Sequence, residues 1–293
     1  MKSEMTFDKV TLPDGRRMSF GRFGDLSGKP VLFLHGFPGS QLQAKMVCAQ
    51  AKNNGACLIA PDRPGFGYSD FDQHRTLIST CNDFQFLMAK LGYQRFAVIG
   101  VSCGGAYALG CAYAFTQQVT AVGLLAGIGP MHIPAIKKDQ LKVLTILFWL
   151  ARHNPKLAIP LILLDCLMFR KSPESAIRVL SKLLTQPDRE LLQINEQVRL
   201  LFGKSLAEGY RQGLTGALQE AHIIGSSRPY SLGEISTPIE VFQGKYDKHV
   251  PPAMGHYIAS NLPNGRFHFN NNAGHLSIVV SEIERCLQLI LNY

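Results

Sequence analysis

Residues 100–104, Gly-Val-Ser-Cys-Gly, hold two side chains that could act as a nucleophile. The hydroxyl of Ser102 or the thiol of Cys103 could attack an electrophilic carbon. A nucleophile on a sharp turn from a strand into a helix needs small residues two positions before and two after it, because side chains there would clash. Glycines take both positions around Ser102, whereas Val101 stands two positions before Cys103. The spacing therefore favours Ser102.

The segments on either side of Ser102 belong to a repeating pattern of strands and helices. Continuous apolar runs, typical of strands buried on both faces, alternate with helical patterns. Asp14-Gly15 separates two strand-like runs and predicts a hairpin, with antiparallel strands, at one edge of the sheet. Repeated β-α-β units predict an α/β fold with a mostly parallel, doubly wound sheet. The expected strands cover 9–13, 16–24, 30–36, 57–63, 95–102, 119–127, 237–247 and the first part of 266–275; the expected helices cover 41–55, 79–92, 103–117, 252–264 and 276–293.

Between about Met131 and Gly233 the strand pattern stops. Several amphipathic helices take its place, with breaks at prolines, and a strand pattern resumes at Thr237. The sequence therefore predicts an α/β core domain formed by residues 1–130 and 234–293, interrupted by a helical insertion at 131–233.

Four segments, in this order, resemble the α/β-hydrolase superfamily: "LFLHGFPGS", "APDRPGFGYSD", "VIGVSCGG" and "FQGKYDKHVP" with "NNNAGH". The resemblance implies an eight-stranded sheet and makes the insertion at 131–233 a helical cap. It also implies that the catalytic residues follow one another in the order nucleophile, acid, histidine.

The resemblance assigns the remaining catalytic groups. His275, between the last strand and the last helix, takes the place of the general base. Asp247, after the strand that follows the insertion, takes the place of the acid, and Gln243 replaces a histidine usual in that motif, a change expected to affect packing more than chemistry. A rival position for the acid, after the strand at 119–127, reads "AGIGP" and has no carboxylate.

The oxyanion hole follows from the same resemblance, as the backbone N–H groups of Phe37 and Cys103. His35, Asp62 and Arg63 are expected to brace the surrounding loops, and His249 to be a loop histidine near the site. Gly36, Phe37 and Trp149 are the expected substrate contacts.

A serine nucleophile implies an acyl-enzyme and the hydrolysis of a carboxylic ester, with no metal or organic cofactor. Apolar residues in the insertion favour a small or medium apolar substrate. A lactonase, a thioesterase or a carbon–carbon bond hydrolase with the same triad remains open. So does a ligand sensor on this fold that does not turn over.

Composition bears on nucleic-acid binding and on the cellular compartment. The net charge is +9, yet Lys and Arg are scattered and form no stripe with aromatic residues, which argues against nucleic acid. The seven cysteines are odd in number and lack CxxC spacing, so we expect reduced thiols in a cytoplasmic protein. The first ten residues show no apolar stretch of a secretory signal.

Two strongly apolar segments, 143–151 and 157–169, are each shorter than the roughly 20 residues of a membrane helix. "RHNPK" separates them with charge and a proline. Buried helices or a pocket wall are therefore expected instead of a transmembrane segment, with peripheral contact to lipid as the alternative.

Overall fold

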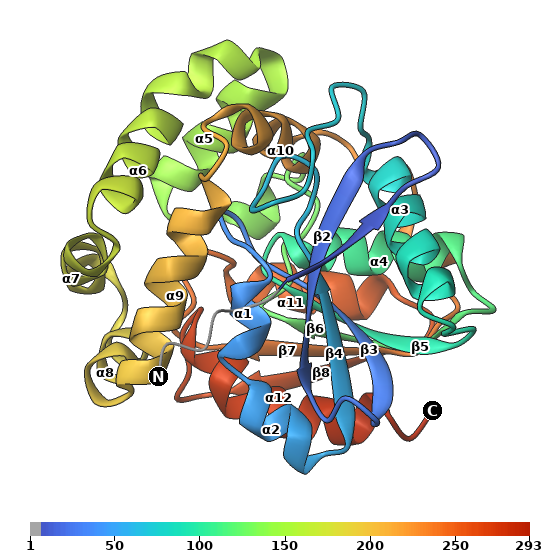
Figure 1. Ribbon diagram of the computed structural model, residues 1–293. Coiled ribbons are helices and arrows are strands. Elements are labelled where there is room, and N and C mark those ends of the chain that lie inside the picture. The colour runs from blue at the N-terminus through green and yellow to red at the C-terminus, as the bar shows by residue number, and fades with distance from the viewer. Residues whose placement is uncertain (1–6) are drawn as a thin grey trace.

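The computed structural model describes residues 7–293, so part of the N-terminal segment considered above for a secretory signal lies outside the described residues. Its centre is one eight-stranded sheet in the order β1-β2-β4-β3-β5-β6-β7-β8 (Figure 1). The predicted eight-stranded, doubly wound sheet is confirmed. The strands are β1 (Asp8–Thr11), β2 (Arg17–Gly24), β3 (Lys29–Leu34), β4 (Ala56–Pro61), β5 (Phe96–Val101), β6 (Val119–Leu125), β7 (Ile239–Gly244) and β8 (Gly265–Asn270).

The directions of the strands show how far the antiparallel pairing predicted at one edge of the sheet extends. Strand β2 pairs antiparallel with both of its neighbours, β1 and β4. All pairs from β4 to β8 are parallel. Only β2 therefore runs against the rest of the sheet, because two successive antiparallel pairings return β1 to the direction of the others.

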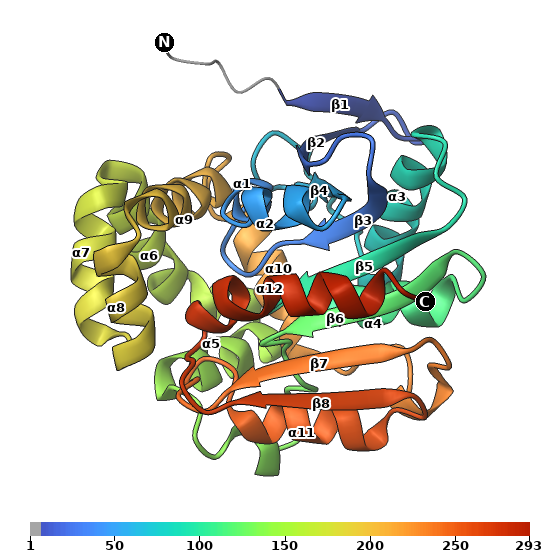
Figure 2. The same ribbon diagram turned by 90° about the horizontal axis from the view of Figure 1, so that it is seen from below.

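Helices cover both faces of the sheet (Figure 2). Helices α2 (Cys48–Asn53) and α12 (Ser277–Ile290) lie on one face, and α3 (Leu77–Lys90), α4 (Gly104–Ala114) and α11 (Pro252–Asn261) on the other. Every residue of β4, β5 and β7 is buried as a result. This double coverage explains why these strands read as continuous apolar runs.

The single helix predicted over 41–55 is wrong. The structure has two short helices there, α1 (Leu42–Lys45) and α2. The chain leaves the helical conformation at Val47, with φ −117° and ψ 19°. Both halves lie on β2 and β4, but α1 also packs on α9 (Glu196–Gly209) of the insertion, whereas α2 packs on α12. The predicted end at Gly55 is confirmed, and its φ of +61° suits glycine.

Residues 126–238 carry helices and no strand. The helices formed by residues 159–209 lie beside the sheet in both views (Figure 1, Figure 2). No helix among residues 7–293 combines the length and the apolar character needed to cross a membrane. The elements are η1 (Ala135–Lys137), α5 (Lys142–His153), η2 (Pro155–Ala158), α6 (Ile159–Lys171), α7 (Pro173–Leu183), α8 (Gln186–Ile194), α9 (Glu196–Gly209), α10 (Thr215–Gly225) and η3 (Leu232–Glu234).

A fully buried ion cluster ties the insertion to the core. Glu220 of α10 lies 2.9 Å from Arg63 Nε and 2.8 Å from Arg75 Nη2, and none of the three side chains is exposed. The hydroxyl of Tyr107 on α4 also donates to Glu220, at 2.8 Å. Arg63 in turn donates to the carbonyl oxygens of His35 and Gly36. The cluster therefore holds α10 against the loop after β3.

We expect Glu220→Ala to lower the free energy of unfolding by about 3–5 kcal/mol, because two buried guanidinium groups lose their counter-charge. Urea unfolding followed by circular dichroism measures the loss. Glu196→Ala is the matched control, since Glu196 pairs with Arg199 on the surface of α9 and is 74% exposed. Its loss should stay below about 1 kcal/mol. Equal losses in the two variants would show that the cluster has no special role.

Candidate active site

Ser102 lies on the turn that joins β5 to α4. Its φ is +52°, in the left-handed region that non-glycine residues rarely adopt. Backbone hydrogen bonds hold it there: its N–H donates to Leu125 O at 3.1 Å, and its carbonyl accepts from the N–H groups of Gly105 and Ile128. Such strain costs on the order of 1–3 kcal/mol and persists where the surroundings fix it. The turn presents the Ser102 hydroxyl away from the sheet.

The glycines on either side are required by close packing. A Cβ on Gly100 would lie 2.7 Å from both Ala108 Cβ and Gly105 Cα. A Cβ on Gly104 would overlap the carbonyl oxygen of Leu34 on β3. The predicted crowding around Ser102 is confirmed.

The structure brings Ser102, Asp247 and His275 together from three separate loops. His275 Nε2 lies 3.1 Å from Ser102 Oγ, and His275 Nδ1 lies 2.8 Å from Asp247 Oδ2. An ionised carboxylate only accepts hydrogen bonds, so Nδ1 carries the proton and Nε2 is left to accept from the serine. Ser102 is 8% exposed and the His275 side chain 18%, so both reach the solvent.

Asp247 is buried and its carboxylate is fully bonded. Oδ1 accepts from the backbone N–H groups of His249 and Val250, both at 2.8 Å. Oδ2 accepts from His275 and, at 3.2 Å, from Gln243 Nε2. Gln243 was expected to affect packing more than chemistry, and in the structure its amide also contacts the Asp247 carboxylate directly.

The pKa of His275 is set by opposing effects. Burial alone would lower the pKa, but the charge and hydrogen bond of Asp247, with the charge of Asp188, outweigh burial and raise it above its ordinary value. The raised pKa makes the His275 imidazole a stronger base.

Asp188 was missed by sequence reasoning. It is the second acidic group facing His275, and it comes from α8 of the insertion. Its buried carboxylate accepts from the backbone N–H groups of His275, Leu276 and Ser277 at 2.8–3.0 Å, and from the Ser277 hydroxyl at 2.7 Å. Asp188 therefore fixes the backbone of the His275 loop. Its only local signal was an acidic residue after a proline, which is typical of any helix N-terminus.

Cys103 lies beside Ser102 with its thiol buried. Burial, with a smaller contribution from Glu220, raises the pKa of the Cys103 thiol to about 12. A thiol with that pKa holds almost no thiolate near neutral pH, and the thiolate is the reactive form. Cys103 is the residue immediately before α4, so its backbone N–H belongs to the positive end of that helix.

His249 lies in a loop next to the site, as expected. Its ring stacks on His275 with centroids 4.7 Å apart and planes 20° apart. Burial first, and then the charge of His275, lowers the pKa of His249 to about 4, so its ring stays neutral. Asp247, His249 and His275 also offer possible metal-ligand atoms within 4.8 Å of one another. Hydrogen bonds already occupy both oxygens of Asp247, so we assign no metal to this cluster.

The loop after β3 approaches Ser102 at Gly36. A Cβ on Gly36 would lie 3.2 Å from Ser102 Cβ, and the Gly36 N–H donates to Gln43 Oε1 at 2.7 Å. His35 is buried and accepts no proton readily, because burial and then the charge of Arg63 lower its pKa well below its usual range. As predicted, His35 and Arg63 brace this loop.

Phe37 and Trp149, two expected substrate contacts, lie in different surroundings. The Phe37 ring lies 6.3 Å from Phe148 of α5 and 6.4 Å from Phe66. Trp149, the next residue on α5, is 56% exposed and its ring lies 4.6 Å from that of His153. Phe148, and not Trp149, is the aromatic residue of α5 next to Phe37.

These features define the class of protein. A mostly parallel sheet with a serine after β5, an aspartate after β7 and a histidine after β8 is the arrangement of an α/β hydrolase. Residues 29–282 match the sequence profile of the alpha/beta hydrolase fold family, so the chain belongs to that family.

Several proteins similar to this chain are named as hydrolases, lipases or esterases. Lipase 1 of Psychrobacter immobilis is 23% identical over 286 residues, which span 95% of this chain and 81% of the lipase. The 2-hydroxy-6-oxo-6-phenylhexa-2,4-dienoate hydrolase of Comamonas testosteroni is 26% identical over 237 residues, or 74% and 70% of the two chains. A hydrolase from Pseudomonas aeruginosa shares the fold, with a TM-score of 0.74 at 17% identity over 98% of each chain. An esterase from Exiguobacterium antarcticum does so with a TM-score of 0.70 at 17% identity, over 98% and 99%.

Proposed function

We propose that this chain is a serine hydrolase that cleaves a carboxylic ester of a small or medium apolar substrate through an acyl-enzyme. The observation that carries the proposal is the hydrogen-bonded series Ser102–His275–Asp247, with spacings of 3.1 and 2.8 Å. A serine hydroxyl next to an imidazole that a buried carboxylate orients is the arrangement that activates serine for acyl transfer.

In the proposed mechanism, Ser102 Oγ attacks the ester carbonyl while His275 Nε2 takes its proton. Asp247 stabilises the imidazolium that forms. The backbone N–H groups of Phe37 and Cys103 stabilise the oxyanion, the latter with the help of the α4 dipole. His275 then gives its proton to the departing alcohol. A water molecule, activated by His275, releases the acid and restores Ser102.

We further propose that residues 131–233 act as a cap over the substrate. Phe148 of α5 supports this role because it lies against Phe37, next to the serine turn. Gly36, Phe37 and Phe148 would then contact the acyl or alcohol group. Phe148 thus replaces Trp149 as the proposed aromatic substrate contact of α5. Aromatic and glycine surfaces without a charged group suit an apolar substrate.

Steady-state turnover of p-nitrophenyl butyrate tests the proposed activity. Repeated turnover that scales with enzyme concentration supports an ester hydrolase. A single turnover, or none by folded protein, contradicts it and favours a ligand sensor.

Carbon–carbon bond hydrolysis is the second candidate, because one of the relatives above is named for a 2-hydroxy-6-oxo-dienoate substrate. Parallel assays with p-nitrophenyl butyrate and with 2-hydroxy-6-oxo-6-phenylhexa-2,4-dienoate separate the two. A higher kcat/KM for the dienoate would replace the ester assignment while leaving the triad in place.

Asp188 acts in this proposal as a positioning residue. We expect Asp188→Asn to lower kcat by about 10- to 100-fold with little change in KM, because one of the two carboxylate oxygens that accept from the His275 loop becomes an amide donor. The acidic limb of the kcat/KM profile should move to lower pH, because the charge of Asp188 helps to raise the pKa of His275.

The control is Glu190→Gln, an equal change of charge on the exposed side of α8. The Glu190 carboxylate accepts from Gln186 on the same helix. A purely structural role for Asp188 would reduce activity equally at every pH, and an unmoved acidic limb would therefore contradict the positioning role.

A further inference from the structure

The insertion exposes a concentrated set of large apolar side chains. Among the described residues fifteen such side chains are exposed, and seven of them lie between positions 143 and 167. Leu164 is 69% exposed and Leu167 59%. Exposed apolar groups at this density mark a binding surface. We call the set the α5–α6 apolar surface; it comprises Val143, Ile146, Trp149, Leu157, Leu163, Leu164 and Leu167.

On each of the two helices these exposed residues lie apart from the residues that are buried against the rest of the protein. Helix α10 packs mainly against α5, whereas α6 packs mainly against α7, α9 and η2. On α5 the buried residues are Leu147, Phe148 and Ala151, and the exposed apolar residues repeat every three positions. On α6 the buried residues are Ile162, Cys166 and Phe169. The short helix η2 contacts both α5 and α6 and carries Leu157 between their exposed apolar residues.

The segment that carries this surface is rich in positive charge. Between positions 142 and 171 the sequence has five Lys and Arg residues and one acid, Asp165. Asp165 is turned inward, where its carboxylate accepts from the hydroxyl of Tyr210 at 2.6 Å. None of the five cations forms a salt bridge with another described residue. They are Lys142, Arg152, Lys156, Arg170 and Lys171.

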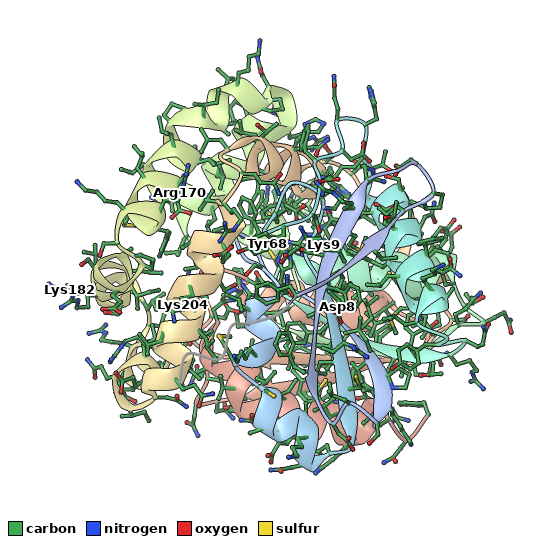
Figure 3. All side chains as sticks on the ribbon, viewed as in Figure 1. Asp8, Lys9, Tyr68, Arg170, Lys182 and Lys204 are labelled. Atoms are coloured by element: carbon green, nitrogen blue, oxygen red, sulfur yellow. The ribbon has the colours of Figure 1, made fainter. Side chains whose placement is uncertain are left out.

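Helices α7, α8 and α9 carry further cationic side chains. A cavity of about 560 Å³ between α7, α8 and α9 is lined by four cationic side chains, over a floor of Ile177 and Leu192. Arg170 on α6 and Lys182 at the outer edge of α7 mark this side of the molecule (Figure 3). The cationic side chains of the cavity are Arg178, Lys182, Arg189 and Arg199.

We propose that the α5–α6 apolar surface docks on an anionic lipid bilayer. Apolar side chains would enter the boundary between headgroups and acyl chains, while the flanking cations meet lipid phosphates. A symmetric pairing of two copies through this surface is disfavoured, because it would place five cations against five. Docking would bring membrane-dissolved apolar esters to Ser102, and this consequence rests on the proposed function. Binding to the bilayer does not depend on the proposed function.

Docking would also orient the site. Helix α5 carries Trp149 on its outer face and Phe148 on its inner face, against Phe37. In this proposal the same helix meets the bilayer on one face and packs on the loop after β3 with the other.

The sequence contains one tryptophan, so Trp149 reports on this surface directly. We expect vesicles of phosphatidylcholine with added phosphatidylglycerol to shift Trp149 emission to the blue and to sediment at least about tenfold more protein than phosphatidylcholine alone. High salt should reduce the anionic preference. Leu164→Glu with Leu167→Glu should abolish binding while leaving turnover of a water-soluble ester unchanged. Leu26→Glu, at an exposed leucine between β2 and β3, is the matched control and should still bind.

The possible results separate the alternatives. Binding by Ser102→Ala as strong as that of the native chain supports docking even if the proposed chemistry fails. An unshifted emission with anionic vesicles, from protein that remains folded, overturns the proposal. A blue shift that grows with protein concentration in the absence of vesicles overturns it as well, in favour of self-association.

Discussion

Ser102→Ala should abolish ester turnover, with kcat falling by about 10⁵- to 10⁶-fold and substrate binding almost unchanged. The reason is that no other group occupies the position 3.1 Å from His275 Nε2 that the serine oxygen takes. The remaining rate comes from the oxyanion donors and from substrate binding alone. Steady-state kinetics with p-nitrophenyl butyrate, on protein freed of contaminating esterases, measure the loss.

Cys103→Ala is the control for Ser102→Ala. Cys103 contributes a backbone N–H in the proposed mechanism, and its sulfur is buried with a pKa of about 12. Activity should therefore stay within about tenfold of the native value. A large loss in Cys103→Ala together with a small loss in Ser102→Ala would reverse the assignment of the nucleophile.

Asp247→Asn should lower kcat by about 10⁴-fold. An asparagine amide could donate to His275 Nδ1, which would move the imidazole proton to Nε2 and remove the acceptor that Ser102 needs. The fold should survive, because one amide oxygen can still accept from the N–H groups of His249 and Val250.

The pH dependence separates the role of Asp247 from a general loss of packing. Without its charge the pKa of His275 falls, so the acidic limb of any residual kcat/KM should lie at lower pH than in the native enzyme. Asp165→Asn is the matched control, a partly buried carboxylate of the insertion that accepts from the Tyr210 hydroxyl. An equal loss of activity in both variants would contradict a specific role for Asp247.

The positions of the strands and of the serine turn could be predicted from the sequence because local physics determines them. Burial on both faces makes β4, β5 and β7 continuous apolar runs, and crowding by Leu34 and Ala108 requires the glycines around Ser102. The break at Val47 could not be predicted, since it accompanies the packing of α1 against α9 and of α2 against α12, which are both distant in the sequence.

The groups that surround the triad depend on contacts between residues far apart in sequence. Asp188 reaches the His275 backbone across 87 residues, and its surroundings in the sequence are those of an ordinary helix start. Helical periodicity marks α5 as amphipathic without saying which side meets the core. For that reason the sequence favoured Trp149 as a substrate contact, whereas Phe148 lies next to Phe37.

Labelling with a fluorophosphonate probe, followed by peptide mapping, tests the proposed nucleophile most directly. The probe reacts with a serine only when a neighbouring base activates it and oxyanion donors receive the phosphoryl oxygen. We expect one label per chain, on Ser102 in the peptide that spans 98–105, and none in Ser102→Ala. A label on Cys103, or no label on folded native protein, would contradict the proposed mechanism.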